Sequence, residues 1–159
     1  MSTFLRFLHW VGFSVWLGAQ LTFMVWVPVS KGVALEPWAH VWKTLAKLQR
    51  WVVAPAAVVA TLTGVGLMMQ SGTHERAGGI WLSGMALSGL LAAIVALAVV
   101  APLSNRMSWA AEQSLADGAK APEAEPLRVR LAVAGTVTGL LILVAIWFSA
   151  MGPSPAAAQ

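Results

Sequence analysis

The sequence predicts an all-α protein, a polytopic membrane four-helix bundle. Of its 159 residues, 58% are hydrophobic and only 10% are charged, and the mean hydropathy is +0.76. Soluble domains carry about 25% charged residues, so this chain cannot cover a water-exposed surface. Four continuous apolar stretches reach the roughly 20 residues that cross a bilayer. They do not alternate in polarity, which excludes the strands of a membrane barrel.

The four predicted membrane helices cover residues 4–29, 51–70, 79–103 and 127–151. The first is longer than the apolar region of a signal peptide, about 7–15 residues, and no Ala-x-Ala cleavage site follows it. We therefore expect it to be a retained helix. The four helices form a single domain over residues 1–152, and residues 153–159 are expected to form a disordered tail.

Between the first two membrane helices, residues 37–50 form an amphipathic segment. Its apolar residues recur at helical spacing: Trp38, Val41, Trp42, Leu45 and Leu48. Pro37 suits the first turn of a helix. The segment either lies on the inner membrane surface or extends the second helix into the cytoplasm, and Pro55 would kink such a continuous helix.

The basic residues are distributed unequally. Eight of the ten lie in the two longer connections or at the start of the fourth helix: Lys31, Lys43, Lys47, Arg50, Arg106, Lys120, Arg128 and Arg130. The opposite side has only Arg6 and Arg76. This asymmetry predicts that the two longer connections face the cytoplasm and that both termini lie outside. The membrane that we expect is the bacterial cytoplasmic membrane, in keeping with the family resemblance described below. We expect contact with the lipid bilayer and with a membrane-protein partner or a second copy, and none with nucleic acid.

Two short patterns suggest an internal repeat. VPVSKG at 27–32 resembles APLSNR at 101–106, and TLTG at 61–64 resembles TVTG at 136–139. The offsets are 74 and 75 residues, in the same order along the chain. The alternatives are chance in a biased composition and two pseudo-symmetric helical hairpins around a central axis.

Two polar residues lie within the first predicted membrane helix. His9 and Gln20 share one helical face with Trp16. Polar groups are costly in lipid, so we expect this face to point into the bundle. The helical rise places Gln20 about 16 Å deeper than His9, a separation that suits an elongated or planar cofactor better than a small ligand.

Several methionines are expected at the depth of His9, namely Met68, Met69, Met85 and Met151. Thioether and imidazole groups together suit Cu(I), and His with Met is an axial pair for haem. The candidate metal ligands are therefore His9, Met68, Met69 and Met85. The candidate cofactor-binding residues are His9, Met85, Trp16 and Gln20. The alternative is structural: methionine often fills helix interfaces, and a membrane histidine can hydrogen-bond across helices.

We predict no catalytic residue. The chain has no cysteine, and no carboxylate lies within a predicted span. Thiolate sites are therefore excluded, and a proton relay built on buried acids is disfavoured. No Ser-His-Asp set, glycine-rich phosphate loop or His-Glu-x-x-His pattern is present, so nothing indicates a hydrolase or a kinase.

The opening FLRFLHWVGFSVWLGAQLTF carries Leu8-His9 and, seven residues after the histidine, Trp16-Leu17-Gly18. With KTLAKLQRW and TLTGVGL, it resembles a bacterial group of CopD-like (copper-resistance D) domains, HemJ-type protoporphyrinogen oxidases and uncharacterised four-helix proteins, most closely the last. The resemblance covers about the first seventy residues. It implies that His9 is an axial ligand of haem b, or that the chain handles copper. HemJ-like proteins also use a lysine in the third helix, and residues 79–103 contain none.

Two functions follow from these observations. In the first, the chain binds haem b or copper through His9, for electron transfer or copper handling. The alternative is a non-catalytic accessory or scaffold subunit of a membrane complex, in which His9 and Gln20 only tie helices together. Haem-dependent oxidation of a porphyrinogen is disfavoured, because the third helix lacks the lysine.

Overall fold

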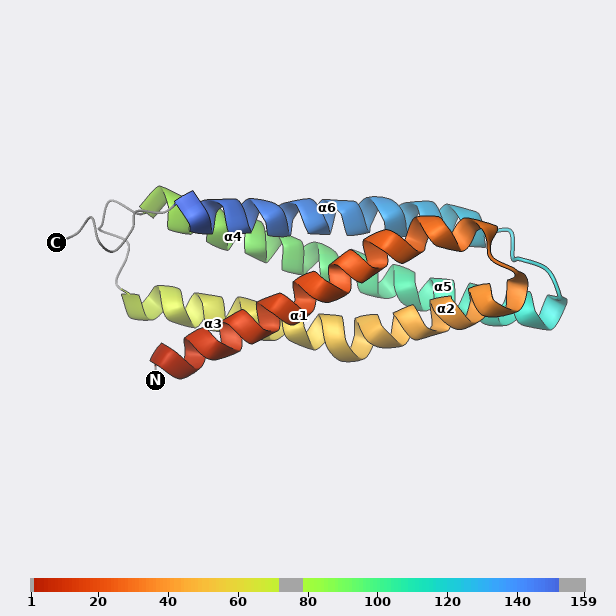
Figure 1. The fold of residues 1–159 in the computed structure, drawn as a ribbon, viewed down its shortest axis with the longest axis horizontal. Coiled ribbons are helices and arrows are strands. Elements are labelled where there is room, and N and C mark those ends of the chain that lie inside the picture. The colour runs from red at the N-terminus through yellow and green to blue at the C-terminus, as the bar shows by residue number, and fades with distance from the viewer. Residues whose placement is uncertain (1, 72–78, 152–159) are drawn as a thin grey trace.

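The computed structural model describes residues 2–71 and 79–151, and within these ranges it is all-helical. Four long helices run side by side in an antiparallel bundle (Figure 1). All four are long and apolar enough to cross a membrane: Thr3–Gly32, Leu35–Gln70, Gly79–Asp117 and Ala124–Met151. The predicted four-helix membrane bundle is therefore confirmed.

The long helices divide into shorter elements where the backbone changes its hydrogen-bond register. The first is α1 (Ser2–Val29), which ends in the 3₁₀ turn η1 (Ser30–Gly32). The second comprises α2 (Leu35–Leu48), the π-helical turn η2 (Gln49–Val53) and α3 (Ala54–Ser71). The third comprises α4 (Gly79–Val95), the π-helical turn η4 (Ala96–Val100) and α5 (Ala101–Asp117), and the fourth is α6 (Ala124–Met151).

The amphipathic segment is a continuation of the second helix, so of the two predicted arrangements the structure has the extended one. Pro55 follows directly after η2, where the N–H of Ala54 bonds to the carbonyl of Gln49, five residues back. A proline in a regular helix clashes with the carbonyl four residues earlier. The wider π turn accommodates the proline ring, and the helix passes through without ending.

The third helix continues to Asp117, well beyond its predicted end at residue 103. Pro102 lies close to that predicted end, but here too a π turn precedes the proline, and the N–H of Ala101 bonds to the carbonyl of Ala96. The helix ends instead at Gly118, whose φ of 69° is the left-handed conformation that commonly closes helices.

The helices pack in pairs: α1 on α3, α4 on α6 and α2 on α5, with α1 also against α6. The start of α1 and the end of α6 lie at one end of the bundle (Figure 1), which we call the apolar end. At the other, basic end, α1 stops, α2 begins, α5 stops and α6 begins. The eight basic residues of the longer connections belong to the half of the bundle nearer this end.

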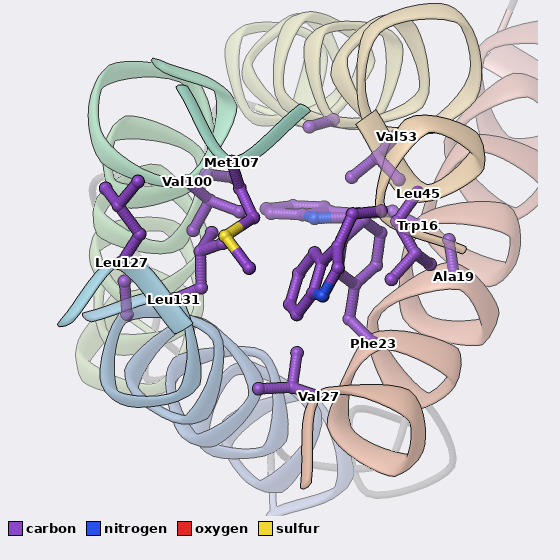
Figure 2. Packing of buried hydrophobic residues seen from close by; sticks show 14 of the residues in the cluster. Trp16, Ala19, Phe23, Val27, Leu45, Val53, Val100, Met107, Leu127 and Leu131 are labelled. Atoms are coloured by element: carbon purple, nitrogen blue, oxygen red, sulfur yellow. The ribbon is translucent and has the colours of Figure 1, made fainter. Parts of the chain in front are cut away.

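Large side chains fill the core toward the basic end, and small ones fill it toward the apolar end. Figure 2 shows Trp16 and Phe23 of α1 and Met107 of α5 converging on the middle of the bundle. Trp38 and Trp42 are also buried, whereas the core positions of α3 and α4 are mostly alanine. Large apolar side chains outside the core are widely exposed, as expected for a surface in contact with lipid.

The two hairpins of the suggested repeat share some structural features. Thr61 and Thr63 of α3 donate to backbone carbonyls four residues back, and Thr136 and Thr138 of α6 do the same. The α1/α3 pair also matches the α4/α6 pair. The hairpins differ at the basic end, where α1 stops but the third helix runs on through α5. The repeat itself stays a prediction.

Candidate functional site

His9 of α1 binds the neighbouring helix α3 through its ring. Its Nδ1 lies 2.8 Å from the carbonyl oxygen of Ala60 and 3.4 Å from the hydroxyl of Thr63. A carbonyl oxygen only accepts hydrogen bonds, so Nδ1 carries the proton. In the neutral ring this leaves the lone pair on Nε2, which makes no hydrogen bond to the described residues.

Glycines bring α1 and α3 into close contact around His9. A methyl group at Gly12 would lie 3.1 Å from both the carbonyl oxygen of Ala56 and the amide nitrogen of Ala60. One at Gly64 would lie 3.1 Å from Cε1 of His9. Without these side chains the backbones approach closely, as small residues allow in membrane helix pairs.

Gln20 binds α6 in a similar way. It is 2% exposed, and its Nε2 donates to the carbonyl oxygen of Gly135 at 2.7 Å. A methyl group at Gly139 would lie 3.2 Å from the sulfur of Met24. Thus α1 packs against the Gly-x-x-x-Gly pair of α6, Gly135 and Gly139. Both polar side chains of the first membrane helix hydrogen-bond to a neighbouring helix.

The other predicted site residues lie on three helices and differ in burial. Trp16 is 2% exposed in the core. Met85 is half-buried on α4, the helix that packs mainly on α6, and Met68 is half-buried on α3. Met69 is 81% exposed and so points away from the bundle.

His9 therefore provides one ligand atom, Nε2. Within residues 2–71 and 79–151 no three His, Cys, Asp or Glu side chains form a metal-binding group. The other described histidine, His40, lies on α2 near the basic end. Among the described residues, the candidates for a second ligand beside His9 are methionine thioethers. His9 could therefore serve as a single axial ligand.

Gln49 is a buried polar residue that the sequence analysis did not select. It is 1% exposed, and its Nε2 lies 3.3 Å from the carbonyl oxygen of Ala96, which places η2 against η4. The signal was present in the sequence, because Gln49 continues the spacing of Trp38, Trp42 and Leu45 along one helical face.

Four buried side-chain atoms in this part of the core have no hydrogen-bond partner among the described residues. They are Trp16 Nε1, Trp42 Nε1, Gln49 Oε1 and Ser104 Oγ. An unsatisfied buried polar group costs about 1–3 kcal/mol. Two are donors, one is an acceptor and one is a hydroxyl, so the core toward the basic end has unused capacity to hydrogen-bond.

A crevice of about 190 Å³ between α1 and α6 reaches Gln20. Phe23, Val27 and Leu131 line its apolar wall. Arg128 also lines it and is bound to Glu125 by contacts of 2.6 and 2.8 Å. The crevice is smaller than the roughly 300–1,000 Å³ of most ligand pockets, so it does not indicate a cofactor site.

Comparison with known proteins gives one match. A family model described as "Predicted integral membrane protein (DUF2269)" matches residues 3–151, nearly the whole chain. No curated protein and no solved structure matches significantly. The match supports the prediction of a membrane protein. It does not support the predicted relationship to CopD-like or HemJ-like proteins.

Proposed function

Since this chain belongs to the DUF2269 family of predicted integral membrane proteins, we propose that it is a non-catalytic accessory or scaffold subunit of a membrane complex. The hydrogen bonds of its intramembrane polar residues support this proposal. His9 binds the carbonyl of Ala60 and Gln20 that of Gly135, so each ties α1 to a different helix. In this proposal His9 and Gln20 hold α1 in position against α3 and α6.

The proposal includes an orientation. The basic end faces the cytoplasm, because positively charged residues near membrane helices are retained on that side. Both termini then lie outside a bacterial cytoplasmic membrane. In this orientation the paired helices α2 and α5 project toward the cytoplasm, where a partner of the complex can reach their polar faces.

A second candidate function is binding of haem b or copper through His9, for electron transfer or copper handling. The observation that favours it is the proton position on His9. Histidines that bind metals usually donate the other ring N–H to a carbonyl or carboxylate, as Nδ1 does to Ala60. Nε2 would be the ligand atom, with Met85 or Met68 as the thioether to test. The resemblance of residues 4–23 to CopD-like and HemJ-like proteins points the same way.

An absorption spectrum of the detergent-purified protein, oxidised and reduced, with metal analysis of the same sample, separates the two. The cells are supplied with haem precursors and copper, and the variants are His9→Ala and, as the matched control, His40→Ala. The scaffold proposal expects no Soret band and no stoichiometric copper in any sample, with His9→Ala only lowering stability. A chromophore or copper that His9→Ala removes and His40→Ala retains would replace it with the cofactor function.

A further inference from the structure

A groove lies on the surface of the bundle, between α6 and the third helix around η4. Its volume is about 640 Å³, and it opens sideways. Its wall is almost entirely apolar, from Val95, Ala98, Val99, Pro102, Leu103, Val129, Val133, Ala134 and Val137. A surface of this kind within the membrane part of the bundle contacts hydrocarbon.

Two arginines lie at one end of this groove. Arg106 belongs to α5 and Arg130 to α6, and because these helices run in opposite directions both side chains lie toward the basic end. Both are exposed, and neither forms an ion pair within the described ranges. The acids nearby are engaged elsewhere, since Glu112 binds Lys43 and Glu125 binds Arg128.

The lined stretch of the third helix is about as long as one membrane leaflet is thick. From Val95 to Arg106 the helix rises about 16 Å at 1.5 Å per residue, and half of a hydrocarbon core of about 30 Å is about 15 Å. An acyl chain lying along the apolar wall therefore brings its headgroup to the level of the arginines.

We propose that this groove binds an anionic phospholipid, with its phosphate between Arg106 and Arg130 and an acyl chain along the wall. Arginine holds phosphate through paired N–H donors, and two arginines without acidic partners attract a net negative headgroup more than a zwitterionic one. Basic pockets between membrane helices are known sites for anionic headgroups. The inference does not depend on the role of His9.

The crevice on the other side of α6 provides a matched comparison. Arg128 lies there, two residues from Arg130 on the same helix, but its charge is already neutralised by Glu125. Arg128 and Arg130 thus lie at similar depth, but only Arg128 has an acidic partner among the described residues. Only the unpaired arginines should select a lipid.

The test uses the full chain in nanodiscs made from equal amounts of phosphatidylglycerol and phosphatidylcholine. The lipids that remain bound after extraction are measured by mass spectrometry. For the wild type we expect enrichment of phosphatidylglycerol on the order of ten-fold. The double variant Arg106→Gln with Arg130→Gln should lose this enrichment, and Arg128→Gln should retain it. Enrichment absent from the wild type, surviving in the double variant, or lost equally in Arg128→Gln would overturn the proposal.

A second variant tests the acyl chain. Ala98→Trp fills the apolar wall at an exposed position and leaves both arginines in place. Loss of the enrichment is expected, because the lipid tail is excluded. Full retention would show that the arginines attract headgroups without the groove. Displacement of the lipid by inorganic phosphate would show a simple anion site and would also overturn the proposal.

Discussion

The two halves of the bundle are held together differently. In the apolar half, α1 and α3 meet at Gly12 and Gly64, and α4 meets α6 at Gly84, where a methyl group would lie 2.7 Å from the ring of Phe148. In the basic half, α2 and α5 enclose large side chains such as Trp42 and Met107, which are 1% and 0% exposed. One half relies on close backbones and the other on bulky side chains.

The surroundings explain this difference. In lipid, pairing two helices removes no apolar surface from water, so close packing and hydrogen bonds between helices provide most of the stabilisation. Beyond the hydrocarbon, burial of a large apolar side chain is favourable by the hydrophobic effect. The π turns η2 and η4 lie between the two halves, where Gln49 of η2 hydrogen-bonds to the carbonyl of Ala96 in η4.

The largest expected effect tests the basic half. Trp42→Ala should reduce the free energy of unfolding by about 3–5 kcal/mol, because it leaves a cavity in a closed core. Trp109→Ala is the control, since that tryptophan is 71% exposed and should change stability by about 0.5 kcal/mol or less. Both are measured by denaturant unfolding in detergent micelles. Equal losses in the two variants would contradict the role assigned to burial in this half.

A medium effect tests the close contact in the apolar half. Gly12→Ala should destabilise by about 1–3 kcal/mol, because the new methyl group meets backbone atoms of α3 that cannot rotate away. At Gly18 of the same helix a methyl group meets nothing within 4 Å. Gly18→Ala should therefore be neutral or stabilise by up to about 1 kcal/mol. The same unfolding assay compares them, and a harmless Gly12→Ala would refute the glycine contact.

The smallest effect tests a hydrogen bond between helices. Gln20→Leu keeps the side-chain volume but removes the bond to Gly135, and should cost about 0.6–1.7 kcal/mol. Thr22→Val is the control, since the exposed Thr22 bonds only within α1, to the carbonyl of Gly18. Thermal unfolding in lipid nanodiscs measures both. A Gln20→Leu protein as stable as the control would mean that this bond does not hold α1 to α6.

Much of the candidate site was predictable from the sequence, and part was not. The sequence predicted that the face of His9 and Gln20 points into the bundle, and the structure agrees. It could not predict that both bind backbone carbonyls, because any helix can offer a carbonyl without a recognisable residue pattern. Gln49 was overlooked for a related reason, since its burial depends on η4 of a distant segment.

The sequence by itself determined the number of membrane helices and the end that carries the basic residues. These are local properties, since an apolar stretch of sufficient length must satisfy its backbone within a helix when it enters lipid. The tertiary structure decided whether Pro55 and Pro102 end their helices, which residues meet Gly12 and Gly84, and which of the described arginines form ion pairs. Each of these depends on which side chains approach from other helices, and one segment of sequence does not contain that information.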